Sequence, residues 1–438
     1  MRYRLFRLAV PALLVLGILL GPACSKKPEG KPADDEEVTL RLQIHWDAAS
    51  PRGQAIRAIL DRFEADHQDI KVTLLGGSGE DTKLLTQIAG GNPPDVIETS
   101  YRNVQVLAQA GVLRPLDELA KDESSFYAPL WELGFYEDTL YGYPWFGHTI
   151  QLVYNRTRFN EAGIAAPPKT WDELHAAAVK LTRDTDGDGK PDRFGLSLPG
   201  KQHGDLSWLF TMFLHQAGGK LVERTNGKWR VAINSEEGLE ALDFYLKLIH
   251  DTCPPGAGTK MGGDVMADFR NGIAAMEFQG PWGVTDIWTL PPEQRFDASA
   301  AEAPAGPGGR AAELGANMTV IPKTCKQPKA ALKLIAFLGG REAQTMIMEG
   351  EKTETGFVPF RVPVRTDLED IPAFEEHPEF LPFVRGFAWP SIEAPIPQWV
   401  RIRDEVYIAE LNKAVLELTT PQAALAAIER EGNRILSE

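Results

Sequence analysis

The sequence predicts an α/β fold with a parallel, doubly wound sheet. Apolar, strand-like runs at residues 38–44 and 71–75 alternate with segments whose apolar residues have helical spacing, such as Ile56, Ile59, Leu60 and Phe63. This alternation is typical of parallel sheets flanked by helices. The length of 438 residues corresponds to two or three domains, and the 43% hydrophobic content suffices for sizeable cores. The chain is therefore predicted to form more than one α/β unit.

The N-terminus has the pattern of an export signal. Three arginines precede an apolar run at residues 8–20, which is too short to span a bilayer comfortably, and small residues lead to Cys24. Residues 1–23 are therefore predicted to be a signal peptide. Cys24 resembles the acylated cysteine of bacterial lipoproteins, although Gly21 and Pro22 depart from the usual preceding pair and leave an ordinary cleavage site as the alternative. Residues 24–37 are polar and predict a tether. We expect an exported, lipid-anchored protein of the cell envelope, on its periplasmic or extracellular face.

Charge and cysteine content narrow the function classes. The formal net charge is −15, and removal of the three arginines in residues 1–23 makes it −18. A surface this acidic repels nucleic acid and anionic lipid, so neither is an expected partner of the folded part. Only Cys253 and Cys325 follow Cys24. Their spacing leaves a disulfide and two separate thiols equally open, and it excludes a zinc site of paired cysteines.

Three strand exits in the first part of the chain carry candidate ligand-binding residues. In open α/β sheets, ligands sit beyond the carboxyl ends of the strands. The first strand leads to a tryptophan and a carboxylate, the second to a glycine-rich turn, and the strand at residues 94–97 to polar and aromatic residues. For the glycine-rich turn, a helix cap is the equally open alternative. The candidates at these exits are Trp46, Asp47, Ser78, Asp81, Glu98, Ser100 and Tyr101.

The rest of the chain continues the alternation. A second apolar strand is predicted at residues 150–154, and Thr170 with Glu173 predicts a capping box at the start of a helix. Ser235 and Thr420 are predicted N-caps of two further helices. Residues 298–312 are rich in Ala, Gly and Pro and predict a loop or crossover, after which a strand resumes at residues 318–321.

Residues 264–283 place a large aromatic side chain at the end of a strand. Val265, Met266 and Phe269 predict a short helix, Asn271-Gly272 a turn, and residues 273–278 a strand of small residues. Gln-Gly-Pro-Trp follows, so that Trp282 lies at a strand-to-loop exit. Taken alone, this stretch leaves open whether Trp282 fills a core or faces a ligand.

Several segments, in this order and spacing, together resemble the extracellular solute-binding proteins of carbohydrate ABC importers, the family of the maltose-binding protein. The resemblance covers most of the chain after the tether. The matching segments are Gly90-Gly-Asn-Pro-Pro-Asp-Val96, Leu107-Ala-Gln-Ala-Gly-Val-Leu113, Tyr141-Gly-Tyr-Pro144, Phe159-Asn-Glu-Ala-Gly163, Pro168-Lys-Thr-Trp-Asp-Glu-Leu174, Phe269-Arg-Asn-Gly-Ile-Ala-Ala-Met276, Gly280-Pro-Trp282 and the helix at residues 330–338 with Glu342-Ala-Gln344.

The resemblance implies a two-lobed fold of the periplasmic binding protein type (type II), with discontinuous lobes joined by hinge strands. The expected lobes are residues 38–147 with 315–361, and 148–314 with 362–438. The implied function is the substrate-binding component of an ABC importer, which captures a mono- or oligosaccharide between the lobes and delivers it to the permease. We expect a monomer that catalyses no reaction, with a small-molecule carbohydrate and the permease subunits as partners.

The expected sugar site is built from aromatic and polar residues. The apolar C–H face of a sugar packs on aromatic rings, and its hydroxyls need fixed donors and acceptors. Trp282 aligns with a stacking aromatic of the family through Gly-Pro-Trp, whereas Thr99 departs from the family, in which that position is aromatic. Trp145 and Phe146 lie at the first expected crossover. Three further candidates, for which a packing role is the alternative, are Trp208, Phe357 and Trp389.

Competing signals are weaker. Asp184, Asp186, Asp188 and Asp192 imitate part of an EF-hand loop, but Gly195 stands where the bidentate glutamate belongs, so the alternatives are a calcium site and a solvated acidic turn. The eight histidines lack the spacing of a transition-metal pair, and we expect no other cofactor. An exported glycosidase is a rival, because paired carboxylates cannot be recognised from spacing. Binding of a non-sugar solute is the second rival; clustered arginines would favour an anion, and the expected site is aromatic and acidic instead.

Overall fold

The largest β-sheet begins with three parallel strands. The computed structural model describes residues 37–77, 86–88, 90–353, 356–394 and 396–438. Strand β1 pairs in parallel with both β2 and β3, which confirms the parallel arrangement expected from the first part of the chain. The order across the sheet is β15-β12-β3-β1-β2, with β6 also paired to β12. The strands are β1 (Val38–Gln43), β2 (Ile70–Leu75), β3 (Val96–Ser100), β6 (Tyr143–Thr149), β12 (Ala312–Val320) and β15 (Pro390–Ser391).

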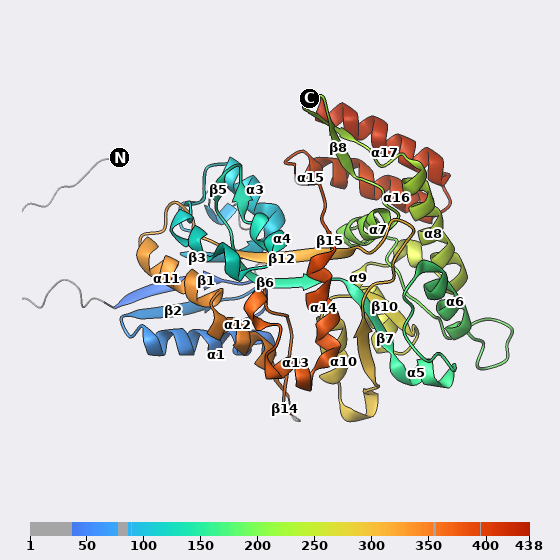
Figure 1. Ribbon diagram of the computed structural model, residues 1–438, viewed down its shortest axis with the longest axis horizontal. Coiled ribbons are helices and arrows are strands. Elements are labelled where there is room, and N and C mark those ends of the chain that lie inside the picture. Colours follow the sequence, from blue (N-terminus) through green and yellow to red (C-terminus); the bar gives the residue numbers. More distant parts are fainter. Residues whose placement is uncertain (1–36, 78–85, 89, 354–355, 395) are drawn as a thin grey trace, which may run out of the picture. The chain divides into compact units, whose positions relative to one another are not determined.

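Strand β12 makes this sheet mixed rather than purely parallel. It runs antiparallel to β3 over Asn317–Val320 and antiparallel to β6 over Leu314–Thr319, and Figure 1 shows it beside β6. These antiparallel pairs were not predicted, because β12 enters the sheet from more than 150 residues further along the chain, and pairing partners so distant leave no local pattern.

A smaller antiparallel sheet follows directly from β6. Its order is β10-β7-β11, with β7 (Gln151–Asn155) between β10 (Met276–Gln279) and β11 (Ala298–Ala301). Only Ile150 separates the end of β6 from the start of β7, so a nearly continuous extended segment passes from one sheet to the other. Side chains along β7 alternate between faces: Leu152 and Tyr154 pack in one hydrophobic core, and Val153 packs in the other.

Strand β11 corrects the prediction of a loop at residues 298–312. Ala298 to Ala301 pair with Asn155 to Leu152 of β7. The segment is short and consists of Ala and Ser, so it carries none of the β-branched or aromatic residues that predict a strand. Pairing with the buried strand β7 supplies the stability that the local sequence lacks.

Two hydrophobic cores organise the described chain. The first surrounds the large sheet and includes Leu40, Val96, Met318 and Phe360; the second includes Phe210, Phe213 and Tyr245. Helices of the first core are α1 (Pro51–Asp66), α3 (Tyr101–Gln109), α4 (Ala128–Glu132), α9 (Gly262–Arg270), α10 (Trp282–Trp288), α11 (Pro328–Leu338), α12 (Arg341–Glu349), α13 (Pro372–Glu376) and α14 (Leu381–Arg385). Helices of the second are α5 (Arg156–Glu161), α6 (Trp171–Leu181), α7 (Gly204–Gln216), α8 (Glu236–Thr252), α15 (Trp399–Ile402), α16 (Ile408–Val415) and α17 (Pro421–Leu436).

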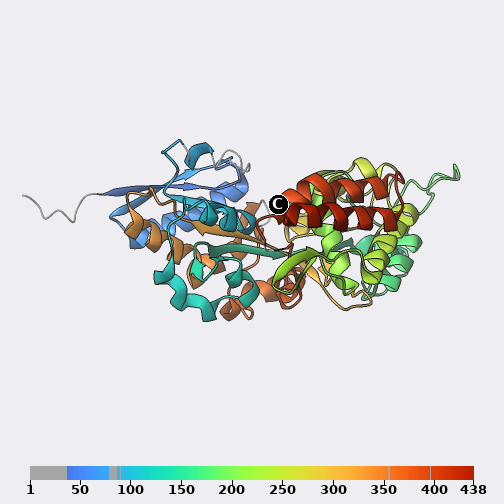
Figure 2. The same ribbon diagram turned by 90° about the horizontal axis from the view of Figure 1, so that it is seen from above.

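The second core is mainly helical. Helix α7 carries a nearly continuous buried run from Leu209 to Leu214 and packs against α8. The last two helices, α16 and α17, lie side by side, drawn in red in Figure 2. Helices α8 and α16 and strands β12 and β15 all contact α7. Its sequence is therefore hydrophobic on most of its circumference rather than on one stripe.

Three predicted helix caps are present. The Thr170 hydroxyl accepts a hydrogen bond from the Glu173 amide at 3.3 Å, and the Glu173 carboxylate accepts one from the Lys169 amide at 2.6 Å. Ser235 accepts from the amide of the third residue of α8 at 3.1 Å, and Thr420 does the same for α17 at 3.2 Å. Each cap satisfies an amide at a helix start that has no partner within the helix, and it does so through residues adjacent in sequence.

Short elements complete the fold. The hairpins are β4 (Phe135–Tyr136) with β5 (Thr139–Leu140), β8 (Val222–Thr225) with β9 (Lys228–Val231), and β13 (Glu351–Thr353) with β14 (Gly356–Val358). The short helical turns are η1 (Asp117–Ser125), η2 (Ala257–Thr259), η3 (Pro292–Gln294), η4 (Thr366–Leu368), η5 (Pro378–Phe380), η6 (Gly386–Ala388) and the π-helical η7 (Arg403–Tyr407).

Residues 276–288 differ from the prediction in two ways. The strand spans Met276–Gln279 rather than residues 273–278, because Ala274 and Ala275 pair instead with the segment at Phe194. Trp282 does not lie in a loop but is the first residue of α10, with Pro281 immediately before it. Proline is compatible with a helix start, since its missing amide hydrogen is not needed there.

The thiols of Cys253 and Cys325 are both free, which resolves the alternative left open by their spacing. Cys253 is buried in the second core, and Cys325 packs at the margin of the first. None of the described helices is both long enough and apolar enough to cross a membrane. Cys24 and the predicted signal peptide lie outside the described residues. The lobe boundaries expected from the sequence stay a prediction.

Candidate functional site

Two tryptophans from different parts of the chain contact the same arginine. Trp46 follows strand β1, Trp282 begins α10, and Arg361 lies three residues after β14. The guanidinium carbon of Arg361 is 5.0 Å from the ring centroid of Trp46 and 4.5 Å from that of Trp282. Both indoles are half-buried, and Arg361 is only 6% exposed. Together with His148, described below, these residues form what we call the tryptophan cluster.

The position of Trp282 is fixed by its neighbours in sequence. The indole lies over the backbone of Gly280, where a Cβ atom would overlap the ring. The Trp282 Nε1 donates a hydrogen bond to the side-chain oxygen of Gln279 at 2.8 Å. Glycine at position 280 and the hydrogen bond at the indole edge therefore hold the ring in one orientation and leave its face to Arg361.

His148 stands at the edge of the Trp282 ring. It belongs to β6, one residue before that strand ends, and its ring centroid is 4.9 Å from that of Trp282 at an interplanar angle of 77°. The ring covers Gly315 of β12, where any Cβ atom would overlap it. Its Nδ1 is buried without a hydrogen-bond partner, and its Nε2 is 4.0 Å from a Glu313 carboxylate oxygen. Burial, and then the positive charges of Arg361, Arg102 and His45, hold the pKa of His148 well below its ordinary value.

The carboxylate of Glu98, beside Trp46, accepts several hydrogen bonds from within the chain. It is 5% exposed and accepts hydrogen bonds from the His45 amide at 2.9 Å, from His45 Nδ1 at 2.7 Å and from the Asn317 side chain. The His45 ring lies against Trp46, with 3.8 Å between centroids. Glu98 therefore positions His45 and, through it, the indole of Trp46.

A second group of charges lies next to the cluster and is also paired. Arg52 of α1 binds Asp286 of α10 at 2.8 Å and also binds Glu351 of β13. This arginine joins three elements far apart in sequence. Its two carboxylate partners are therefore committed to Arg52 and not to Arg361.

The polar atoms of Arg361 are only partly satisfied. Its Nη1 donates to the carbonyl of Phe360 at 2.9 Å, while its Nε is buried with no partner. Among the described residues, no carboxylate lies within ion-pair distance of its guanidinium. Burial, with the charge of Arg52 second, lowers the pKa of Arg361 to about 9; Glu98, Asp286 and Glu351 act in the opposite direction but are outweighed.

A narrow pocket of about 40 Å³ adjoins this cluster. Its two main aromatic walls are Tyr101, which begins α3, and Trp399, which begins α15. Both carry a buried polar atom without a partner, the Tyr101 hydroxyl and the Trp399 Nε1. We call it the Tyr101 pocket; its lining is Tyr101, Arg102, Gln105, Val106, Leu133, Glu393, Ala394, Ile396, Pro397, Trp399, Val400 and Arg403.

The charges of the Tyr101 pocket form a paired network. Arg102 donates to Glu393 at 2.7 Å and to Glu313 at 3.1 Å, and Arg403 lies 3.6 Å from Glu393. The Arg102 guanidinium also covers the Tyr101 ring at 4.6 Å. Glu313 belongs to β12 and links the pocket to His148, since its other oxygen is the one 4.0 Å from the imidazole.

The pKa values of this network follow from burial and pairing. Burial raises the pKa of Glu313 to about 7, Arg102 works against that rise, and Glu393 adds to it. For Glu393, burial also acts to raise the pKa, but Arg102 and Arg403 together lower it. The pKa of Arg102 is raised despite burial, because Tyr101, Glu393 and Glu313 favour the charged form.

The structure brings together five of the residues expected from the sequence. Trp46, Glu98 and Trp282 belong to or adjoin the tryptophan cluster, and Tyr101 lines the adjoining pocket. Ser100 caps α3 by accepting from the Arg102 amide at 3.4 Å, so it holds the helix start next to that pocket.

Three expected residues lie near the site but present little or nothing to it. Trp145 and Phe146 are both fully buried and stack on each other at 4.2 Å, and Phe146 supports Trp46 from behind at 5.3 Å. Asp47 is exposed, and its carboxylate accepts from the Ala49 amide at 2.8 Å in the turn before α1. Trp145 and Phe146 therefore have a packing role, and Asp47 stabilises a turn.

The remaining expected residues lie elsewhere or outside the described chain. Trp208 donates from its indole to Asp205 at 3.2 Å and packs on the second core. Phe357 is 57% exposed in β14, and Trp389 stacks with Arg310 at 5.2 Å. Ser78 and Asp81 lie outside the described residues.

Sequence reasoning missed the charged residues of the site. Arg361 is the one charge in the apolar run at residues 357–364, and His148 lies within the mainly apolar run at residues 143–154. A basic side chain within such a stretch is a signal that could have found both, because a buried polar or charged group needs a partner or a function. Arg102 and Glu393 are separated by 291 positions, and no local sequence pattern predicts that pair.

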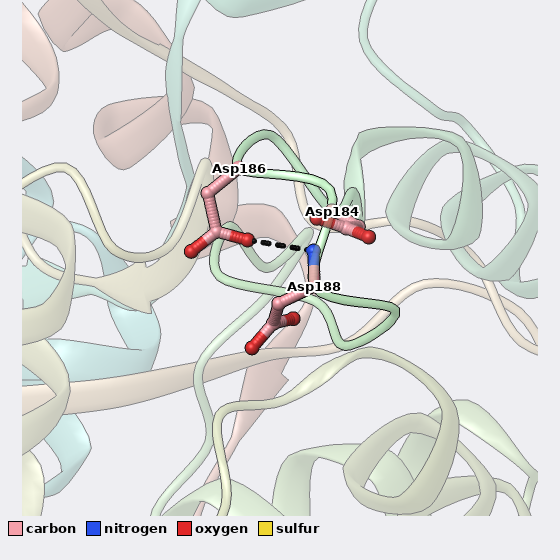
Figure 3. Close-up of side chains that lie close together, drawn as sticks. All are labelled: Asp184, Asp186 and Asp188. Carbon is pink, nitrogen blue, oxygen red and sulfur yellow. Dashed lines mark hydrogen bonds between the residues drawn. The ribbon is translucent and has the colours of Figure 1, made fainter.

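The acidic loop at residues 184–192 is shown in Figure 3. Asp184, Asp186 and Asp188 are exposed and can bring one carboxylate oxygen each within 4.8 Å of the others. The carboxylates mainly accept backbone amides, Asp184 from Gly187 at 2.6 Å and Asp186 from Asp188 at 3.1 Å. Asp192 bonds Thr185 instead. The loop satisfies its own backbone, and the calcium site suggested by its sequence stays a prediction.

Comparisons with protein families and with individual proteins agree on one kind of relative. The model of the bacterial extracellular solute-binding protein family matches residues 47–345. An uncharacterised lipoprotein of Streptomyces antibioticus is 29% identical over 343 residues, which cover 75% of this chain and 71% of that protein. The arabinooligosaccharide-binding protein of Bacillus subtilis is 25% identical over 374 residues, covering 82% of this chain and 81% of the relative.

Solved structures agree with these relatives. An ABC transporter solute-binding protein from Thermotoga lettingae, bound with α-D-tagatose, superimposes with a TM-score of 0.76 and 27% identity, covering 91% of this chain and all of that one. An acarbose receptor of Streptomyces glaucescens superimposes with a TM-score of 0.77 at 21% identity, covering 92% of this chain and 99% of that one. The two sheets and two cores of this chain therefore have the two-lobed architecture of solute-binding proteins.

Proposed function

Because the chain belongs to the bacterial extracellular solute-binding protein family, we propose that it is the substrate-binding component of an ABC importer. It captures a mono- or oligosaccharide at the tryptophan cluster and delivers it to the membrane permease. Support comes from the relatives, which include proteins named for binding arabinooligosaccharide and maltotriose, and from the neighbouring structure that holds tagatose. The sugar and the permease are the proposed partners.

The observation that carries this proposal is the pair of half-buried indoles with unpaired polar atoms beside them. Trp46 and Trp282 are each partly exposed, and the exposed parts of their rings offer aromatic surface for the apolar side of a sugar ring. Arg361 Nε and His148 Nδ1 are buried without partners next to Trp282 and can bond sugar oxygens. Buried polar atoms are rarely left unpaired, so their gathering at one indole indicates a place for a ligand.

The two indoles pack on different cores, which suits capture by closure. Trp46 packs against the first core and Trp282 against the second. A ligand that contacts both stabilises the arrangement in which the two cores approach each other. The near-continuous β6–β7 segment and β12 are the proposed hinge strands of this motion.

The proposed function involves no catalysis. Glycoside hydrolysis needs one carboxyl group as acid and a second as nucleophile or base. Around the cluster and the pocket, Glu98 is bonded to His45 and Asn317, while Glu313 and Glu393 are bonded to Arg102. Carboxylates occupied in this way support binding rather than hydrolysis, and the glycosidase remains an outcome of the test.

A membrane anchor would keep the protein close to its permease. We place the anchor at Cys24, acylated after removal of residues 1–23, with residues 24–37 as tether and a monomeric binding unit. The similar Streptomyces antibioticus protein is named a lipoprotein. Labelling with an alkyne-tagged palmitate should mark the wild-type protein and not Cys24→Ser, and light scattering after size exclusion should give one chain per particle. Label on both proteins equally, or none on either, would remove the anchor from the proposal.

The decisive experiment is isothermal titration calorimetry of the purified protein against a panel of mono- and oligosaccharides, with peptides, amino acids and inorganic anions as non-sugar solutes. We expect binding to at least one sugar, with no change in that sugar after long incubation. Binding restricted to non-sugar solutes would refute sugar capture, and release of shorter sugars would favour the glycosidase.

A further inference from the structure

Arg361 is a buried cation that has no carboxylate partner among the described residues. It is 6% exposed, its Nε has no partner, and its Nη1 donates to a neutral carbonyl. Removing a guanidinium from water without a paired anion is strongly unfavourable, so charged residues are rarely buried unless they are paired. A ligand with an anionic group would therefore give Arg361 a counter-charge that none of the described residues provides.

The acids nearest to Arg361 do not supply that charge. Glu98 is held by His45 and Asn317. Asp286 and Glu351 are held by Arg52. They lessen the effect of burial on the guanidinium, yet the pKa of Arg361 still falls to about 9. Each of these three acids therefore has a partner other than Arg361.

A second donor lies beside the same indole. His148 touches the edge of Trp282, and its buried Nδ1 has no partner. A neutral imidazole with its proton on Nδ1 can donate a hydrogen bond from that atom. Burial is the main cause of the lowered pKa of His148, and the guanidinium groups of Arg361 and Arg102 add to it, so positive charge lies near this edge of Trp282.

We propose that the solute is an acidic sugar, whose carboxylate binds between Arg361 Nε and His148 Nδ1 while its ring packs on Trp282. This inference rests on the proposed sugar capture and names the class of sugar. A carboxylate supplies both acceptor atoms and the missing charge, and hydrogen bonds between charged groups are about twice as strong as neutral ones. A neutral hydroxyl would satisfy one nitrogen but would leave the guanidinium uncompensated.

Matched ligands test the class of solute. Calorimetry would compare D-glucuronate with D-glucose, D-galacturonate with D-galactose, and digalacturonate with its dimethyl ester, which removes the negative charges and keeps the carbonyl oxygens. Acetate and succinate serve as carboxylates without a sugar. We expect at least one acidic member to bind at least tenfold more tightly than its neutral counterpart, and the two non-sugar carboxylates to bind at least a hundredfold more weakly than that sugar.

A variant tests the residue. Arg361→Gln should weaken binding of the acidic sugar at least tenfold more than it weakens binding of the neutral counterpart. Arg365→Gln is the matched control, because this arginine also covers an aromatic ring, Phe126 at 5.6 Å, but pairs with Asp367 away from the cluster. It should leave both affinities unchanged. Arg361→Lys, which keeps the charge, should retain part of the preference and serves if the glutamine variant does not fold.

The outcomes separate this inference from the proposed function. Neutral sugars that bind as tightly as their acidic counterparts would overturn the acidic sugar and leave sugar capture standing. An equal loss for both ligands in Arg361→Gln would assign Arg361 to general packing and overturn its role. Succinate or acetate binding as tightly as every sugar would refute both proposals, and so would the absence of binding by any sugar, acidic or neutral.

Discussion

Two arginines on either side of His148 show two ways of placing a cation in a protein interior. Arg102 has a side chain 26% exposed, covers Tyr101, and pairs with Glu313 and Glu393. Arg361 covers Trp46 and Trp282 and pairs with no carboxylate among the described residues. The pKa is raised for the first and lowered to about 9 for the second. The aromatic contacts are similar, so the difference lies in the counter-charges.

This difference separates structural charges from charges available to a ligand. The network of Arg102 joins β12, α3 and the segment before α15 and is satisfied within the chain. Arg361, whose guanidinium pairs with no described carboxylate, belongs to the tryptophan cluster. A paired charge stabilises the fold once formed, whereas an unpaired one gains its full stabilisation only when a ligand arrives. Four predictions test this contrast.

The largest effect is expected for Arg102→Met. The change leaves Glu313 without its main partner and Glu393 with only Arg403 and the Ser207 hydroxyl as described partners. Breaking a buried ion pair in this way destabilises by about 3 kcal/mol. Guanidinium unfolding without ligand measures the change. Arg365→Met, which loses a pair with the more exposed Asp367, should cost about 1 kcal/mol or less. Equal effects of the two variants would show that the Arg102 network is not a special structural element.

The next largest effect concerns binding. Trp282→Ala should weaken the sugar by about 2 kcal/mol or more, roughly thirtyfold in Kd, because a buried aromatic anchor is lost. Calorimetry measures it with whichever sugar binds the wild type. The control is Trp229→Ala, since Trp229 is 41% exposed in β9 and touches neither the cluster nor the pocket. Unchanged affinity together with unchanged unfolding would remove Trp282 from the site.

A smaller, pH-dependent effect is expected from Glu313. Burial raises its pKa to about 7 in the folded protein, above the ordinary value of a glutamate, so folding favours its protonated form. The resulting stabilisation is complete below about pH 4.5 and is lost as the pH rises through about 7. Between about pH 5 and about pH 8, wild type should therefore lose about 2 kcal/mol relative to Glu313→Gln. Parallel stability curves of the two proteins would contradict a raised pKa.

The smallest effect is expected for Arg361→Met, measured without ligand. Methionine removes an unpaired buried charge and retains a long apolar side chain, so the unfolding free energy should stay within about 1 kcal/mol of wild type or rise. The sign is opposite to that for Arg102→Met, and both variants can be followed in the same guanidinium titration. A loss comparable to that of Arg102→Met would mean that Arg361 is a structural cation too, and the contrast would fail.

Much of the fold could be predicted because its signals are local. The caps at Thr170, Ser235 and Thr420 involve residues within three positions, and the alternation of strands and helices needs only short windows of sequence. Trp282 could also be singled out, since Gly280-Pro281 fixes where its ring lies. The strand at Ala298–Ala301 could not, because only its pairing with β7 makes it a strand.

The candidate site likewise has one part that the sequence predicts and one part that it does not. The sequence determined that the chain is an α/β protein of the solute-binding type, and it singled out Trp46, Glu98, Tyr101 and Trp282 as residues at strand exits. Only the tertiary structure decided which charges are paired: Arg102 meets Glu393 across 291 positions, while Arg361 meets two indoles and, among the described residues, no acid within ion-pair distance. The physical reason is that desolvation and ion pairing depend on distances in space, and residues far apart in the chain leave no common pattern from which those distances could be read.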